Sequence, residues 1–160
     1  MTLIVEDGSG RADANAYVTI SYADDYHALR DNAAWEAATE AAREAAIIRA
    51  TDHLDRVHRY RGEPLSAGQA LAWPRTGVED RTGRAVTGVP AGIRRACAEL
   101  ALRALAEDLD PDLPHGGRVK SETVGPISTT YFDGAPGGKT RPAVSGLLGG
   151  LTAGAGLERA

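Results

Sequence analysis

The scarcity of large apolar side chains limits what this chain can fold into more than any other feature of its sequence. Leu, Ile, Val and Phe together make up 30 of 160 residues, whereas alanine alone contributes 29. A content of about 19% lies at the edge of what a chain needs to bury enough surface to fold alone. The net charge is only −4, so self-repulsion does not favour disorder. We therefore expect one folded domain with a thin core, assisted by neighbouring molecules.

Capping residues and apolar spacing predict two helices in the first part of the chain. The first covers about residues 22–31, with Ser21 as its cap and Asp24 as the partner in a capping box. The second runs from near Thr39 to about His58 and carries a narrow apolar stripe.

A long irregular stretch, residues 59–89, separates these helices from a third one. Within it, residues 66–72 have capping-box spacing and are expected to form a short helix. The third helix starts at Pro90, carries apolar side chains on two sides and ends at Pro111. Apolar groups on two sides predict a central, buried helix.

The last part of the chain changes from a helical period to an alternating one. Residues 119–124 and 127–132 read as two strands around a Gly-Pro turn, which predicts a β-hairpin. Residues 142–151 are expected to form a last helix. The predicted fold class is therefore mainly α: a small bundle of three to four helices with one β-hairpin and a flexible C-terminal segment. We expect residues 1–148 to be a single domain and residues 149–160 to be a flexible Gly/Ala-rich tail.

Composition argues against several classes of protein. No run approaches the roughly 18 apolar residues of a membrane span, and the N-terminus lacks the pattern of a secretory signal. Cys97 is the only cysteine, so an internal disulfide is excluded and a reducing compartment is favoured. The pI of about 5.5 argues against a basic nucleic-acid binder.

Two glycine-rich segments resemble nucleotide sites but lack the required spacing. In residues 134–140, Asp133 stands where the first glycine of a phosphate-binding loop belongs. In residues 8–13, Asp13 replaces the third glycine of a dinucleotide fingerprint. We expect both segments to be turns, and therefore no cofactor.

The titratable residues also form no recognisable catalytic or metal site. His53 and His58 are five positions apart, not the four that places two ligands on one helix face. Asp52 and Asp55 could pair with His58 or Arg49, but a solvated helix face is the favoured expectation for both. We therefore predict no catalytic residue and no metal.

Protein interfaces are the remaining candidate sites. Trp73 is expected mainly to hold the long loop against the core, and the alternative is that it anchors an interface with another protein. Arg75 can form forked hydrogen bonds to carboxylates. A lone hairpin needs a partner, and the leucines near the C-terminus are expected to order only against one. The candidate interface residues are Trp73, Arg75, Ile127, Thr129, Tyr131, Leu147, Leu148 and Leu151.

Several stretches together resemble a family of tailed-phage proteins that is often described as DnaT-like. The stretches are residues 5–8 (VEDG), 13–18 (DANAYV), 49–55 (RATDHLD), 69–75 (QALAWPR), 119–122 (VKSE) and 124–127 (VGPI). The resemblance extends to about residue 148.

This resemblance implies a structural virion protein without cofactor: the head–tail connector adaptor. Such a protein forms a ring, dodecameric in the particle, under the portal protein. It extends the channel through which DNA passes without sequence-specific binding, and it provides the platform for the stopper and other neck or tail proteins. The implied location is the virion neck of a tailed phage or gene-transfer agent, after synthesis in the cytoplasm of a bacterial host.

The alternative is a DnaT-like single-stranded DNA-binding module. Such modules need a cationic groove interleaved with stacking aromatic rings. Arg59, Arg61 and Arg75 lie near aromatic residues in the sequence, but many acidic residues balance them.

Overall fold

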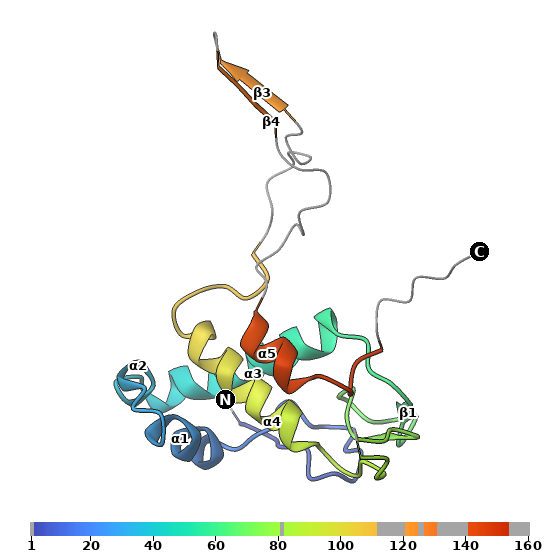
Figure 1. Cartoon of the computed structure of the whole chain (residues 1–160). Helices are drawn as coiled ribbons and strands as arrows, with labels where there is room; N and C mark the ends of the chain where they lie inside the picture. Colours follow the sequence, from blue (N-terminus) through green and yellow to red (C-terminus); the bar gives the residue numbers. More distant parts are fainter. Residues whose placement is uncertain (1, 81, 112–120, 125–126, 131–140, 154–160) are drawn as a thin grey trace, which may run out of the picture.

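The described residues, 2–80, 82–111, 121–124, 127–130 and 141–153, form a mainly helical structure in this computed structural model (Figure 1). This confirms the predicted fold class. The helices are α1 (Ile20–Ala28), α2 (Ala33–Glu36), α3 (Glu40–Val57), α4 (Ala91–Ala104) and α5 (Pro142–Leu147). Two antiparallel pairs of strands accompany them, β1 (Glu63–Pro64) with β2 (Arg75–Thr76) and β3 (Ser121–Val124) with β4 (Ile127–Thr130).

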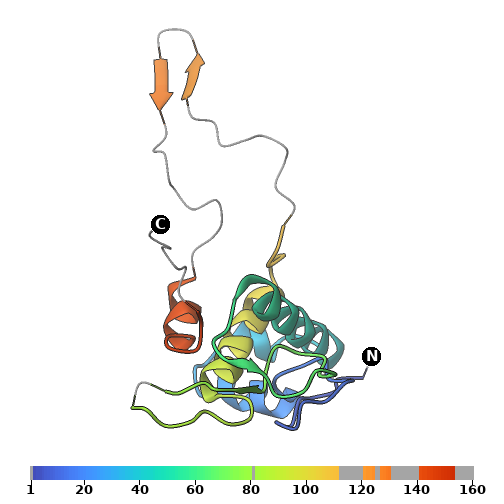
Figure 2. The ribbon, with the colours of Figure 1, turned by 90° about the vertical axis from the view of Figure 1, so that its right-hand side faces the viewer.

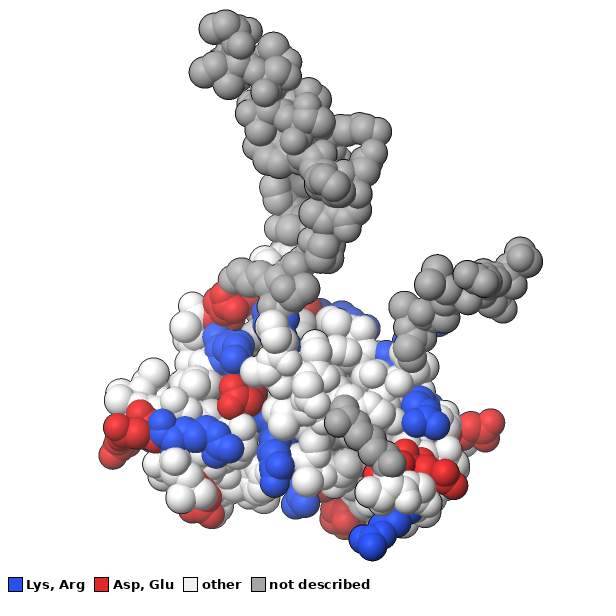
Figure 3. All heavy atoms as spheres, in the orientation of Figure 1, with Lys and Arg blue, Asp and Glu red and all other residues white. Residues whose placement is uncertain are grey.

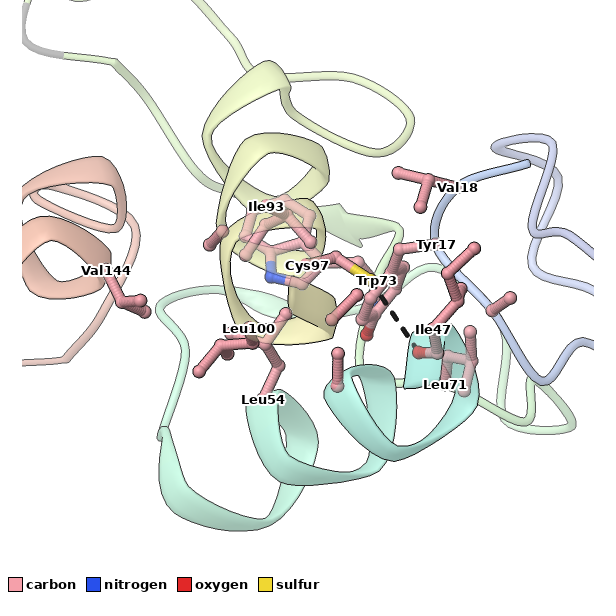
Figure 4. Close-up of a cluster of buried hydrophobic side chains, with 14 of the residues drawn as sticks. Tyr17, Val18, Ile47, Leu54, Leu71, Trp73, Ile93, Cys97, Leu100 and Val144 are labelled. Atoms are coloured by element: carbon pink, nitrogen blue, oxygen red, sulfur yellow. Dashed lines mark hydrogen bonds between the residues drawn. The ribbon is translucent and has the colours of Figure 1, made fainter. Parts of the chain in front are cut away.

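The two longest helices, α3 and α4, pack on each other and bury many small side chains. Both helices bury alanines: Ala46 and Ala50 on α3, and Ala96, Ala98, Ala101 and Ala104 on α4. Because the distance between packed helices depends on the side chains at the contact, alanines allow a close approach. Figure 4 shows larger side chains from α3, α4 and the loops closing the core around this contact. The chain thus builds its core despite few large apolar residues.

The first helix begins two residues earlier than predicted. The Thr19 hydroxyl, not Ser21, caps it and accepts a hydrogen bond of 3.0 Å from the Tyr22 amide. Both residues are good caps, and the extended backbone of Thr19 decides between them. The predicted cap of α3, Thr39, is confirmed and accepts a hydrogen bond from the Ala42 amide.

The prediction of a short helix at residues 66–72 is wrong, because the structure has no helix there. The Gln69 side chain accepts a hydrogen bond from the Ser66 amide and donates to the carbonyls of Leu71 and Pro74. These side-chain bonds replace the backbone bonds of a helix and hold a turn instead. The turn leads into the β1–β2 pair, in which Glu63 lies opposite Thr76.

A partly buried carboxylate holds the long loop against α3. Asp55 accepts hydrogen bonds from the Tyr17 hydroxyl and, at 2.8 Å, from the Ala72 amide. The Tyr17 hydroxyl in turn accepts from the Trp73 amide at 3.2 Å. Burial raises the pKa of Asp55, although these hydrogen bonds oppose the shift. The prediction that Asp55 lies on a solvated face is therefore wrong.

The glycine-rich loop near the N-terminus wraps a carboxylate of its own chain. Glu6 is buried, and its side chain accepts hydrogen bonds from the amides of Gly8, Gly10 and Arg11 at 2.8–3.0 Å. Gly8 and Gly10 have positive φ angles, which glycine adopts without strain. The loop is a turn, as predicted, and an internal anion already fills it.

The C-terminal helix α5 packs on α4 of its own chain. Val144, Leu148 and Leu151 are buried there, which contradicts the prediction that this segment orders only against a partner. Gly92 of α4 permits the contact, because a Cβ at this position would lie 2.4 Å from the Leu147 carbonyl oxygen.

The predicted tail also touches the domain at its start. The Ala153 amide donates to the Arg59 carbonyl at 2.8 Å, and the Arg61 amide donates to the Leu151 carbonyl at 2.9 Å. Residues 154–160 lie outside the described residues, so the boundary at residue 148 stays a prediction.

The predicted hairpin is present as β3 and β4. The strands pair antiparallel with Val124 opposite Ile127 and Glu122 opposite Thr129. Figures 1 and 2 draw this pair apart from the helices. The outer ends of the predicted strands, including Tyr131, lie outside the described residues.

Candidate nucleic-acid interface

Two tyrosines lie side by side on the outer face of α1. Tyr22 and Tyr26 are four residues apart, which places them on the same side of a helix. Their rings stack with centroids 6.4 Å apart and planes 20° apart. Both side chains are partly exposed, so they offer aromatic surface to a ligand.

Arginines from two helices approach these rings. The guanidinium of Arg30 lies 3.6 Å from the centroid of the Tyr26 ring, and that of Arg94, on α4, lies 5.6 Å from the Tyr22 ring. Both distances suit cation–π attraction. Arg95 follows Arg94 and is exposed. We call Tyr22, Tyr26, Arg30, Arg94 and Arg95 the tyrosine platform.

A shallow hollow of about 370 Å³ opens at the platform. It is lined by Tyr22, Asp25, Tyr26, Leu29, Arg30 and Arg95. Leu29 is 86% exposed, a large value for a leucine, and adds apolar surface at the edge of the hollow. Figure 3, in the orientation of Figure 1, shows basic and acidic residues interspersed over the visible face of the molecule, so this face carries no extended positive patch.

Glu99 of α4 holds the Tyr26 ring in place. The Tyr26 hydroxyl donates to one carboxylate oxygen of Glu99 at 2.9 Å, and Arg103 donates to the other at 2.9 Å. Burial raises the pKa of Glu99, but the hydrogen bonds from Arg103 and Tyr26 outweigh it and lower that pKa overall. Glu99 therefore remains a charged acceptor that orients the ring.

His27 ties the opposite side of α1 to α4. Its Nε2 lies 3.1 Å from the Ala98 carbonyl oxygen, and its Nδ1 lies 2.9 Å from the side-chain nitrogen Nδ2 of Asn32. A neutral ring that donates from Nε2 and accepts at Nδ1 satisfies both contacts. Burial lowers the pKa of His27, although the Ala98 contact opposes the shift.

We expect the free energy of unfolding to fall as the pH drops from 7 to 5. The folded pKa of His27 lies below its ordinary value, so the unfolded chain takes up the proton first and acid favours unfolding. The stabilisation by neutral His27 is present above about pH 6.5 and is lost as the pH falls toward the folded pKa. Urea unfolding at both pH values should show a smaller pH dependence for His27→Gln. Burial also lowers the pKa of His58, so part of the dependence should remain. An unchanged pH dependence in His27→Gln would contradict this assignment.

The sequence-predicted residues near the long loop serve the core. Trp73 has no exposed surface and packs edge-to-face on Tyr60, so the structure favours its pinning role. Arg75 donates to the carbonyls of Arg61, Gly62 and Ala72 at 2.6–3.1 Å. Its forked hydrogen bonds are thus made within the chain.

The other predicted interface residues lie far from α1 in the sequence and form no part of the platform. Leu148 and Leu151 are buried and Leu147 is partly buried against the core. Ile127 and Thr129 lie on β4, and Tyr131 lies outside the described residues. An interface role for the hairpin stays a prediction.

The tyrosine platform was not predicted from the sequence. The four-residue spacing of Tyr22 and Tyr26 and the Arg94–Arg95 pair were readable signals. No local pattern, however, indicates that α1 and the start of α4 pack together.

No helix among the described residues is long and apolar enough to cross a membrane. The described part of the chain likewise contains no group of three His, Cys, Asp or Glu residues that could hold a metal ion.

Comparison with known proteins corrects the functional expectation. No curated protein and no solved structure matches the chain. A family model described as "Putative DnaT-like ssDNA binding protein" matches residues 1–160. This description names the binding of single-stranded DNA.

The match contradicts the identification as a head–tail connector adaptor. The match supports the alternative, a DNA-binding module. It therefore also contradicts the predictions that depended on the adaptor: the location in the virion, the portal and stopper partners, and the dodecameric ring. The expectation that DNA only passes through a channel of the protein is also wrong, since the family is described as binding single-stranded DNA. With a match over the whole of its length, the chain belongs to the family of DnaT-like single-stranded DNA-binding proteins.

Proposed function

We propose that this protein binds single-stranded DNA through the tyrosine platform on α1 and the start of α4. The observation that carries the proposal is the pair of stacked tyrosines with a guanidinium near each ring. Single-strand binders combine aromatic surfaces, on which bases stack, with cations that meet the phosphates. Arg30 covers one side of Tyr26, and bases also stack on guanidinium planes.

Two platform arginines are available to a ligand, because Arg94 and Arg95 make no side-chain hydrogen bond or ion pair to a described residue, whereas Arg30 donates to the Tyr26 carbonyl at 2.8 Å. Arg95 makes no ion pair or side-chain hydrogen bond to any described residue and can meet a phosphate. Arg61 and Arg75, in contrast, donate to backbone carbonyls of their own chain. We infer that the protein acts by binding alone, without catalysis, in the cytoplasm, where a lone thiol such as Cys97 stays reduced.

A titration with a fluorescent oligonucleotide tests this function. We expect single strands to bind more tightly than a duplex of the same sequence, because only unpaired bases expose faces for stacking. Three platform arginines predict that log K falls with log salt with a slope of about −2, at about 0.7 per phosphate contact. Equal affinity for duplex, or no binding at low salt, would exclude the proposal.

Replacing Arg95 by glutamine should weaken binding several-fold at about 50 mM salt and reduce the salt slope by about 0.7. The reason is the loss of one phosphate contact without loss of an internal ion pair. Arg59→Gln is the matched control, since Arg59 is also exposed but lies outside the platform. An equal effect of both substitutions would indicate a general charge effect and not a site.

A further inference from the structure

The hollow at the tyrosine platform contains an acidic side chain that phosphate binding does not explain. Asp25 lines the hollow together with both tyrosines and Arg95. A carboxylate repels the DNA backbone, so it opposes binding unless it meets another part of the ligand. The part of a single strand that attracts a carboxylate is a base edge with N–H donors.

Asp25 is placed to meet a base that lies on the platform. Tyr22, Asp25, Tyr26 and Leu29 follow one another at spacings of three, one and three residues, so they form a single stripe on α1. A base stacked in the hollow is therefore flanked by aromatic surface and by the Asp25 carboxylate on the same helix face.

The Asp25 carboxylate is also free to accept hydrogen bonds. Arg30 and Arg95 line the same hollow, yet neither forms an ion pair with Asp25, and no other described residue donates to its side chain. The neighbouring acid Asp24, in contrast, accepts from Trp35 at 2.7 Å and from Arg43 at 3.1 Å. Asp24 is therefore structural, whereas Asp25 is available to a ligand.

The bases differ in the donors that they offer to a carboxylate. Guanine has two adjacent donors, N1–H and the N2 amino group, which match the two oxygens of a carboxylate as an arginine fork does. Cytosine and adenine each have one amino group beside an acceptor. Thymine has a single N3–H between two carbonyl oxygens, which the carboxylate repels.

We propose that Asp25 makes the platform selective for guanine in single-stranded DNA. The proposal rests on the proposed function, because it assigns a base preference to the same site. Asp25 is then a specificity-determining residue, and Arg30, Arg94 and Arg95 supply the backbone attraction that does not depend on sequence.

Competition between short oligonucleotides tests the preference. Oligothymidylate with one central guanine should bind about fivefold more tightly than plain oligothymidylate, at the lower end of what a bidentate base contact contributes. Inosine in place of the guanine lacks the N2 amino group and should lose most of this gain. In Asp25→Asn the guanine preference should shrink toward equality, and oligothymidylate should bind more tightly because a repulsive charge is gone.

Asp52→Asn is the matched control, since Asp52 is exposed on α3 and outside the platform. It should strengthen the binding of every oligonucleotide slightly and leave the guanine preference intact. If the wild type binds all oligonucleotides equally, or if Asp25→Asn keeps the preference, this inference is overturned while the proposed function stands. If no oligonucleotide binds, the proposed function itself fails.

Discussion

The double variant Tyr22→Ala/Tyr26→Ala should bind single-stranded DNA about 100-fold more weakly than the wild type. Each aromatic side chain that stacks on a base contributes about 1–3 kcal/mol, and about 2.7 kcal/mol corresponds to a factor of 100 in the dissociation constant. The loss should persist at high salt, because stacking does not depend on counterions. Fluorescence titration at two salt concentrations measures it.

The variant Tyr22→Phe/Tyr26→Phe is the control for this experiment. It keeps both rings and removes the hydroxyl with which Tyr26 contacts Glu99. We expect an affinity within a few-fold of the wild type, with the small loss reflecting a less restrained ring. Wild-type affinity in the double alanine variant, with circular dichroism showing an intact fold, would mean that DNA binds elsewhere.

Replacing Trp73 by alanine should reduce the free energy of unfolding by about 3–5 kcal/mol. Trp73 is the residue at which the long loop enters the core, and its side chain is fully buried. The substitution removes the edge-to-face contact with Tyr60, whose ring centroid lies 5.7 Å away, and leaves a cavity. In a chain with so few large apolar residues, little is available to fill that cavity.

Trp73→Phe distinguishes packing from hydrogen bonding at this position. The Trp73 Nε1–H is buried and has no hydrogen-bond partner among the described residues, so phenylalanine removes a polar group whose burial is unfavourable. We expect a much smaller loss of stability than in Trp73→Ala, measured by urea unfolding. Equal losses in both variants would show that the indole itself, and not an aromatic ring in general, is required.

Helix positions were predictable where short-range signals decide them. Thr39 is a good cap followed by helix-forming residues, and the structure begins α3 there. Residues 66–72 have a similar signal, yet they form a turn, because the Gln69 side chain reaches two carbonyls of the following loop. A capping pattern cannot indicate whether a side chain finds a better partner further along the chain.

The candidate site was less predictable, because overall charge does not show where charges lie. The pI of about 5.5 argues against a basic nucleic-acid binder. The structure places Arg94 of α4 beside Tyr22 of α1, so cations and rings meet locally in an acidic protein. Asp55 shows the same limit, since the carboxylate expected in solvent is partly buried and accepts a hydrogen bond from the Tyr17 hydroxyl.

Interactions within a few residues, such as caps, apolar periods and the alternation of the hairpin, could be read directly from the order of the amino acids. The platform depends instead on α1 lying against α4, where His27 meets the Ala98 carbonyl and Tyr26 meets Glu99, more than 70 positions away in each case. Such contacts depend on how all the helices bury their apolar faces together, so they exist only once the chain has folded.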